Sequence, residues 1–127
     1  MTSQARFWAE VTTDGRAFCL MRGIGTCDGK IDAHHMLSKQ RLRSLHWQAC
    51  WDKKTYPELE HSPLAGVELD DLLSDPRNGA PLCRRHHTIV SVCPIPQERV
   101  PQAVFDFALE YGVEHHLPYE IPVAVGA

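Results

Sequence analysis

The chain has 127 residues with a formal net charge of −3, and 43% of its residues are hydrophobic. This length suits one domain with a modest core, so we expect a single domain over residues 1–127. The N-terminal sequence MTSQARFWAE has no apolar core after a basic start, and no apolar run approaches the roughly 20 residues that cross a bilayer, so we expect a cytoplasmic protein without a membrane partner.

The first predicted element is a short helix near the N-terminus. Phe7, Trp8 and Val11 fit one apolar face of this helix, and Gly15 suits its end. The glycine-rich sequence CLMRGIGTCDG at residues 19–29 follows and predicts a loop bracketed by cysteines.

Hydrophobic periodicity and turn residues predict six further short elements. In chain order they are a strand at 31–35, a helix at 40–51, a helical turn at 69–73, a strand at 80–82, a helix at 83–92 and a helix at 101–112. The last helix is the clearest, because Pro101 suits its first turn and Gly112 its end. Its apolar stripe is expected in the core and consists of Val104, Phe105, Ala108 and Leu109.

The cysteines and histidines of the chain indicate a metal site. Five cysteines cannot all pair as disulfides, and cysteines that cluster with histidines in a reducing compartment more often bind metal. Cys19 and Cys27 flank the glycine-rich loop, while Cys83 and His86 stand three apart on a predicted helix and therefore share a face. Two ligands from a loop and two from a helix predict a structural zinc ion.

Two alternatives to this zinc site stay open. The cysteines could instead be small buried hydrophobic residues, which is a common position for free thiols. Cys93 could replace His86 as the fourth ligand, although it follows the predicted helix in a proline-bound segment. Cys50 lies on the apolar side of another predicted helix, so we expect it to pack in the core.

Adjacent histidines place a geometric constraint on any second site. Successive helical residues point about 100° apart, so if His86 faces the zinc ion, His87 is free for another metal. On a strand, His34 and His35 would point to opposite sides and could share a site only if the strand ended or bent there.

The segments CDGKIDAHHMLSKQRLR and LLSDPRNGAPLCRRHHTIVS resemble the two halves of the HNH endonuclease motif, as found in small HNH proteins of actinobacterial phages. The positions that carry the resemblance are His34-His35, Asn78, Cys83 with His86, and His87. The resemblance implies an α+β fold with a small zinc-stabilised ββα-metal core and additional helices. The motif core would span about residues 19–92, with the helix at about 101–112 packed on it.

The resemblance also implies a set of catalytic roles. His34 and His87 would bind a catalytic divalent ion (Mg²⁺, Mn²⁺, Ni²⁺ or Zn²⁺), and His35 would be the general base that takes a proton from water. Asn78 would brace the loop before the helix or contact the metal, and the Asn-Gly pair favours bracing. Asp32 would be a further ligand, a partner that orients an imidazole, or a plain strand-edge residue.

Clustered basic residues fit this reading despite the negative net charge, because phosphate binding depends on local charge. The candidates for nucleic-acid contact are Arg84, Arg85, Lys39, Arg41 and Arg43. The expected partner is double-stranded DNA bound with limited sequence specificity, by a monomer or a homodimer. A phage-encoded protein of this family would work in the host cytoplasm, and phage DNA packaging, mobility and restriction are all open as its role.

Two other functions remain in competition with the nuclease. The first is a zinc-stabilised nucleic-acid-binding module without catalysis, which would have no need for His35. The second is a zinc-bearing interaction protein whose acidic stretch, between Glu58 and Asp71, binds a partner.

Overall fold

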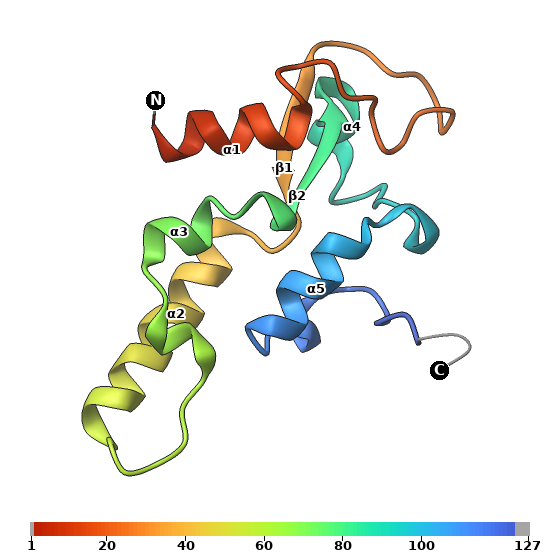
Figure 1. Cartoon of the computed structure of the whole chain (residues 1–127). Coiled ribbons are helices and arrows are strands. Elements are labelled where there is room, and N and C mark those ends of the chain that lie inside the picture. Colours follow the sequence, from red (N-terminus) through yellow and green to blue (C-terminus); the bar gives the residue numbers. More distant parts are fainter. Residues whose placement is uncertain (1, 124–127) are drawn as a thin grey trace.

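The computed structural model describes residues 2–123, and in that range it contains five α-helices and a two-stranded antiparallel sheet (Figure 1). This is an α+β fold, as the sequence predicts. The elements are α1 (Ser3–Thr12), β1 (Ile31–His35), α2 (Lys39–Thr55), α3 (Leu69–Leu73), β2 (Gly79–Cys83), α4 (Arg84–Ile89) and α5 (Gln102–Glu110). Among the helices so described, none is long and apolar enough to cross a membrane.

The sheet joins two segments that are far apart in the sequence. β1 pairs with β2 so that Asp32 lies opposite Leu82, and His34 lies opposite Ala80. α4 begins directly after β2, because Cys83 is its N-cap and the Cys83 sulfur accepts a hydrogen bond from the backbone N–H of His86. The end of β2 therefore delivers the first turn of α4 to one end of the sheet.

α1 covers one side of the sheet and approaches β2 very closely. A Cβ atom added at Gly79 would lie 2.2 Å from Cγ2 of Val11, so only glycine permits this approach. The helix ends at Thr12, earlier than the expected end at Gly15, because Thr13 takes the left-handed conformation at a φ of 52°.

α2 and α3 lie side by side and extend away from the sheet (Figure 1). α2 begins after Ser38, whose hydroxyl accepts a hydrogen bond from the N–H of Arg41, and it is longer than the predicted helix at 40–51. Its buried face carries Leu42 and Ala49. His46 on the same helix donates from Nε2 to the carbonyl of Val67, which ties α2 to the segment before α3.

α5 supplies much of the core, although its buried stripe differs from the predicted one. Phe105 and Phe107 are both almost fully buried, whereas Leu109 is 50% exposed. The helix packs on the short 3₁₀ helix Pro76–Asn78, and Arg77 joins the two by its ion pair with Glu110, while a second ion pair with the N-cap residue Asp75 holds the Arg77 side chain. The helix therefore supports the start of β2, the strand that leads into α4.

α4 is shorter than the predicted helix at 83–92, because it ends at Ile89. The backbone N–H groups of Val92 and Cys93 both donate to the carbonyl of Ile89, which closes the helix in a turn. Thr88, Ile89 and Val90 form a β-branched run with low helix propensity, and prolines follow at positions 94 and 96.

Candidate functional site

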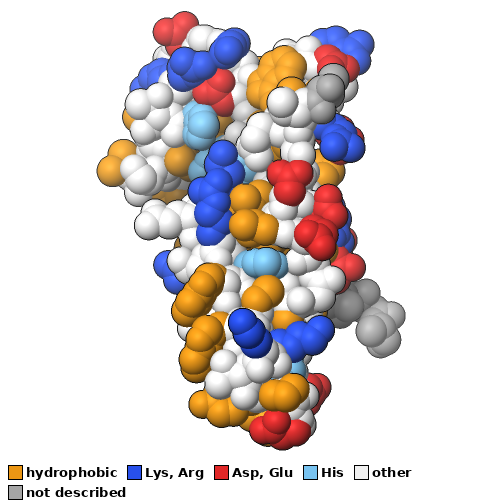
Figure 2. Space-filling view, turned by 90° about the vertical axis from the view of Figure 1, so that its left-hand side faces the viewer, with side chains coloured by type: hydrophobic (Ala, Val, Ile, Leu, Met, Phe, Trp, Pro, Cys, Tyr) orange, Lys and Arg blue, Asp and Glu red, His pale blue; other side chains and the backbone are white. Residues whose placement is uncertain are grey.

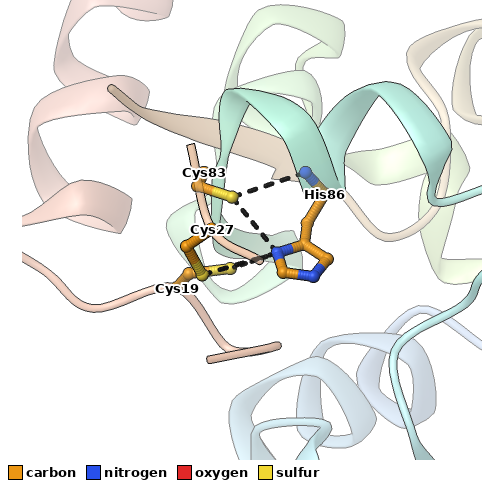
Figure 3. Close-up of side chains that lie close together, drawn as sticks. All are labelled: Cys19, Cys27, Cys83 and His86. Carbon is orange, nitrogen blue, oxygen red and sulfur yellow. Dashed lines mark hydrogen bonds between the residues drawn. The ribbon is translucent and has the colours of Figure 1, made fainter. Parts of the chain in front are cut away.

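Three cysteines and one histidine converge between the glycine-rich loop and α4 (Figure 3). One ligand atom from each of Cys19, Cys27, Cys83 and His86 lies within 4.8 Å of the other three, and the group could hold a metal ion. Nδ1 of His86 is 3.1 Å from the sulfur of Cys83, 3.4 Å from that of Cys19 and 3.6 Å from that of Cys27. These are the four residues that the sequence predicts for a structural zinc ion.

The spacing of these atoms fits a tetrahedral zinc ion. Zinc binds sulfur at ~2.3 Å and imidazole nitrogen at ~2.0–2.1 Å, so a tetrahedral site separates nitrogen from sulfur by about 3.5 Å. The three observed nitrogen–sulfur distances of 3.1, 3.4 and 3.6 Å scatter around that value. Cys93, the alternative fourth ligand, does not belong to the group.

Hydrogen bonds from the surrounding backbone orient the ligands. Nε2 of the fully buried His86 lies 2.6 Å from the carbonyl oxygen of Ile24, so it donates there and leaves the lone pair of Nδ1 directed at the sulfurs. Burial works to raise the pKa of the Cys83 thiol, but hydrogen bonds from the backbone of His86 and Asp28 prevail and lower this pKa to about 6. The thiolate form is therefore favoured at neutral pH for Cys83, whereas burial and the neighbouring cysteines raise the pKa of the Cys27 thiol to about 11, so zinc binding there would have to displace the proton.

The glycine-rich loop is fastened to the first turn of α4. The backbone N–H of Arg84 donates to the carbonyl of Lys30, and the N–H of Arg85 donates to the carbonyl of Asp28. Gly29 lies between these two bonds at a φ of +85°, and a Cβ atom added there would lie 2.6 Å from Cβ of Arg84. The loop can reach α4 in this way only with glycine at that position.

A second group of polar side chains forms where β1 meets α4. Asp32 and His34 point from the same face of β1, and His87 points to them from α4. Nδ1 of His87 lies 3.0 Å from Oδ2 of Asp32, and the His34 and His87 rings are 5.3 Å apart between centroids. The adjacent residues His86 and His87 thus face different groups, as the helical geometry predicts.

Charge and burial set the protonation of this second group. The Arg84 guanidinium donates from Nε and Nη2 to the two carboxylate oxygens of Asp32 and lowers the pKa of that carboxyl. Burial, followed by repulsion from the His87 and His35 imidazoles, lowers the pKa of His34 to about 4. His34 is therefore neutral at pH 7 and has a lone pair to offer. When Nδ1–H of His87 donates to Asp32, the lone pair of His87 is on Nε2.

His35 points away from this group, as expected for the next residue along a strand. Its ring stacks on Phe7 of α1 with 4.1 Å between centroids, and its Nε2 donates to the carbonyl of Leu73 at 3.1 Å. Burial is the largest influence on its pKa, which is lowered from the usual value. The structure therefore brings Asp32, His34 and His87 together but leaves His35 against α1.

Asn78 is fully buried and braces the turn that follows β1. Its side-chain oxygen accepts from the backbone N–H of Leu37, and its side-chain nitrogen donates to the carbonyl of the same residue, both at 2.9 Å. The N–H of Met36 donates to the carbonyl of Asn78 as well. Of the two roles that the sequence allows, this arrangement is the bracing one.

The basic residues proposed for nucleic-acid contact divide into two groups. On α4, Arg84 is held by Asp32, and Arg85 donates to the carbonyl of Thr26. On α2, the Lys39 ammonium lies 3.4 Å from the side-chain oxygen of Gln4, and the Arg41 guanidinium lies 3.3 Å from Nδ1 of His116. Arg43 is exposed on the same helix.

Two contacts of the site leave no recognisable signal in the amino-acid sequence. Phe7, which stacks on His35, is recognisable in the sequence only as an apolar helix residue. The carbonyl of Ile24, which fixes the His86 ring, leaves no trace in the sequence because any residue could supply it. Comparison with protein-family models, with curated proteins and with solved structures finds no match for this chain.

Proposed function

We propose that this chain is an HNH-type metal-dependent endonuclease that hydrolyses phosphodiester bonds in DNA. The observation that carries the proposal is the meeting of His34 from β1 with His87 from α4, next to a Cys₃His group that fits zinc. The order of strand, strand and helix, with a bracing Asn78 before the second strand, agrees with the motif that the sequence resembles.

In this proposal β1, β2 and α4 form a ββα-metal core with two separate metal sites. Zinc at the Cys₃His group is structural, because four protein ligands leave no open position for substrate. The second ion is held by His34 and His87, each of which has a ring nitrogen to offer as a neutral imidazole. When bound there, a divalent ion would act as a Lewis acid and stabilise negative charge on the scissile phosphate.

Asp32 positions His87 in this scheme. A carboxylate that accepts from the distal N–H of a ligating imidazole fixes the ring and its tautomer, and Asp32 has that relation to Nδ1 of His87. The bidentate contact with Arg84 keeps the carboxylate ionised and in place. Asp32 is thus proposed as the partner that orients an imidazole, in preference to a metal ligand.

His35 is proposed as the general base. Burial is the largest influence that lowers the pKa of its imidazole below the usual value, so the ring is neutral at pH 7 and has a lone pair that would accept a proton from the attacking water. In the described conformation this ring stacks on Phe7, so the role requires the His35 side chain to turn toward the phosphate.

The packing of His35 favours a second candidate function, a zinc-stabilised DNA-binding module without catalysis. An imidazole that stacks on Phe7 and donates to Leu73 has a sufficient structural reason to be present. The two functions make opposite predictions for cleavage, because the module would bind DNA and leave it intact.

A plasmid assay tests the nuclease. Supercoiled plasmid is incubated with zinc-loaded protein and Mg²⁺, Mn²⁺, Ni²⁺, additional Zn²⁺ or no added metal. We expect metal-dependent nicking that is lost in His34→Ala and His87→Ala and retained in His115→Ala, whose side chain is 89% exposed. No cleavage with any ion, from protein that holds one zinc per chain, would contradict the enzyme and support the binding module.

A separate pair of variants tests the base. His35→Gln keeps a side-chain N–H for the carbonyl of Leu73 but has no basic nitrogen, whereas His35→Phe keeps the stacking on Phe7. If His35 is the base, both variants lose cleavage by about 100-fold or more while retaining their zinc. If His35→Gln cleaves as fast as the wild type, His35 is not the general base. The proposal that the chain is a nuclease would not be affected by that result.

A further inference from the structure

α2 exposes two large aromatic side chains that the catalytic scheme does not use. Trp47 is 62% exposed and Trp51 is 44% exposed, and the two stand four residues apart on the face opposite the buried Leu42 and Ala49. Four residues advance about 6 Å along a helix, close to twice the ~3.4 Å rise between stacked bases. One planar base therefore fits between two side chains at this separation.

The same helix is strongly basic although the whole chain is negative. It carries five basic residues and one acidic residue in a protein of net charge −3; the basic ones are Lys39, Arg41, Arg43, Lys53 and Lys54. Arg43 precedes Trp47 by four residues and Lys54 follows Trp51 by three, so a cation stands on the exposed face at each end of the aromatic pair. Within residues 2–123 neither of these two cations forms a salt bridge.

The surface beside the aromatic pair is hollowed. A groove of about 650 Å³, which Arg43, Trp47, Gln48 and Leu69 help to line, runs between α2 and the start of α3. The space-filling view shows hydrophobic side chains beside Lys and Arg side chains in its lower half, where α2 lies (Figure 2). Aromatic side chains flanked by cations suit a ligand with flat rings and a polyanionic backbone.

We propose that this face of α2, made of Arg43, Trp47, Trp51 and Lys54, binds single-stranded nucleic acid. Trp47 and Trp51 stack on unpaired bases, and Arg43 and Lys54 contact the flanking phosphates. A duplex hides the faces of its bases, so paired DNA offers phosphates and base edges to this surface but no base face on which tryptophan could stack. The proposal rests on the proposed nuclease function for its biological meaning, and it narrows the substrate from double-stranded DNA to DNA with an unpaired segment.

The position of α2 connects this surface with the cleavage site. The helix begins at Lys39, four residues after His35 ends β1, and the turn between them is held by Asn78. Lys39 and Arg43 are one turn apart, so basic side chains continue from the aromatic pair toward the sheet. A nucleic-acid strand that lies along α2 would thus extend toward the end of β1.

Fluorescence anisotropy of labelled oligonucleotides tests the binding. Zinc-loaded full-length protein is titrated, without added divalent metal, into a fluorescein-labelled dT20 strand and into a mixed-sequence 20-base-pair duplex. We expect tighter binding of dT20, and a loss of at least tenfold in Trp47→Ala/Trp51→Ala, because each stacked base contributes ~1–3 kcal/mol and 1.4 kcal/mol is tenfold. Trp47→Phe/Trp51→Phe should retain most of the affinity, since phenylalanine also stacks.

Two controls separate this face from the rest of the chain. Trp8→Phe changes a tryptophan on α1 and should bind dT20 as the wild type does. Arg43→Gln/Lys54→Gln should keep the preference for single strands but lower the slope of log affinity against log salt by about 1.4, at ~0.7 for each lost phosphate contact. Circular dichroism and zinc content confirm that each variant is folded.

The outcomes distinguish the binding proposal from the nuclease proposal. Equal dT20 affinity for the wild type and Trp47→Ala/Trp51→Ala would overturn the binding proposal. A second result would also overturn it: sedimentation equilibrium that shows a dimer for the wild type and a monomer for the double variant, with no change in dT20 binding. The face would then join two copies of the chain. Loss of plasmid nicking does not affect the anisotropy result, which is measured without cleavage.

Discussion

The stability of the chain should depend on the concentration of free zinc. The glycine-rich loop contributes Cys19 and Cys27 to the Cys₃His group, and it contains no helix or strand of its own between the described elements α1 and β1. An ion that joins this loop to Cys83 and His86 binds the folded chain only, because the unfolded chain does not present the four ligands together. Each increase in free zinc should therefore stabilise the folded state.

The size of this effect follows from mass action. Above the dissociation constant, each tenfold rise in free zinc adds about 1.4 kcal/mol to the free energy of unfolding, so three decades add about 4 kcal/mol. For a domain of 127 residues this corresponds to a rise in Tm of roughly 10–20 °C. The rise should be linear in the logarithm of free zinc.

Thermal melts in zinc-chelator buffers measure this rise. His86→Ala, which removes the nitrogen ligand, should flatten the dependence and lower the bound zinc below one per chain. Cys50→Ser and Cys93→Ser alter cysteines outside the group and should melt as the wild type does. A Tm that stays constant across the series in the wild type would refute the structural zinc site, and a zinc loss in Cys93→Ser would refute the choice of His86 as fourth ligand.

Three further predictions concern the surroundings of the site. Asn78→Ala removes both side-chain hydrogen bonds to the backbone of Leu37 and should lower the free energy of unfolding by about 2–4 kcal/mol in urea titrations, since buried backbone groups lose their partners. Gly79→Ala places a methyl group against the Val11 side chain of α1 and should lower the free energy of unfolding by about 1–3 kcal/mol, whereas Gly66→Ala, with no atom within 4 Å, should leave it within about 0.5 kcal/mol of the wild type. The pKa of His34 is about 4 in the folded chain, below its ordinary value of 6.5. The contribution of His34 to stability is therefore present above pH 6.5 and declines as the pH falls toward 4. NMR titration of its ring should give a midpoint near 4, and a midpoint near 6.5 would contradict its burial.

Local sequence signals predicted most of the secondary structure. The strand at 31–35 and the helical turn at 69–73 agree with β1 and α3 at both ends; the turn residues Asp28-Gly29 precede the strand, and Asp75-Pro76 follows the helical turn. The helix at 40–51 was predicted too short, since the signal used was its apolar face and α2 continues to Thr55 beyond the last buried residue, Ala49. The end of a helix cannot be predicted from apolar periodicity where its last turns consist of exposed polar residues.

The core stripe of α5 shows why packing partners matter. Leu109 continues the helical spacing of Val104, Phe105 and Ala108, but it faces solvent, and Phe107 is buried in its place. Periodicity alone defines an apolar stripe without saying how wide the contact surface is. Here the 3₁₀ helix Pro76–Asn78 contacts α5, and the guanidinium of Arg77 lies 5.7 Å from the Phe107 ring centre. That neighbour comes from a distant segment, which the local pattern does not contain.

The two histidine pairs differ in how much the sequence could predict about them. For His86 and His87, the 100° step of a helix was enough to predict that only one of the two rings faces the cysteines. For His34 and His35, the alternation of a strand separated the rings, but only the position of α1 decides what the second ring meets. The stacking of His35 on Phe7 is a tertiary contact over 28 positions, and no local spacing reports it.

The adjacency of His86 and His87 also makes the two proposed metal sites dependent on one another. α4 is only six residues long and has no stable existence by itself, so its position depends on the bonds at its first turn. Those bonds come from the glycine-rich loop, which the Cys₃His group holds through His86. Loss of zinc would release that loop, and with it the helix that presents His87 to Asp32 and His34. The proposed nuclease activity should therefore fall in proportion to zinc occupancy even when the second metal is saturating, whereas two independent sites would leave that activity unchanged until the chain unfolds.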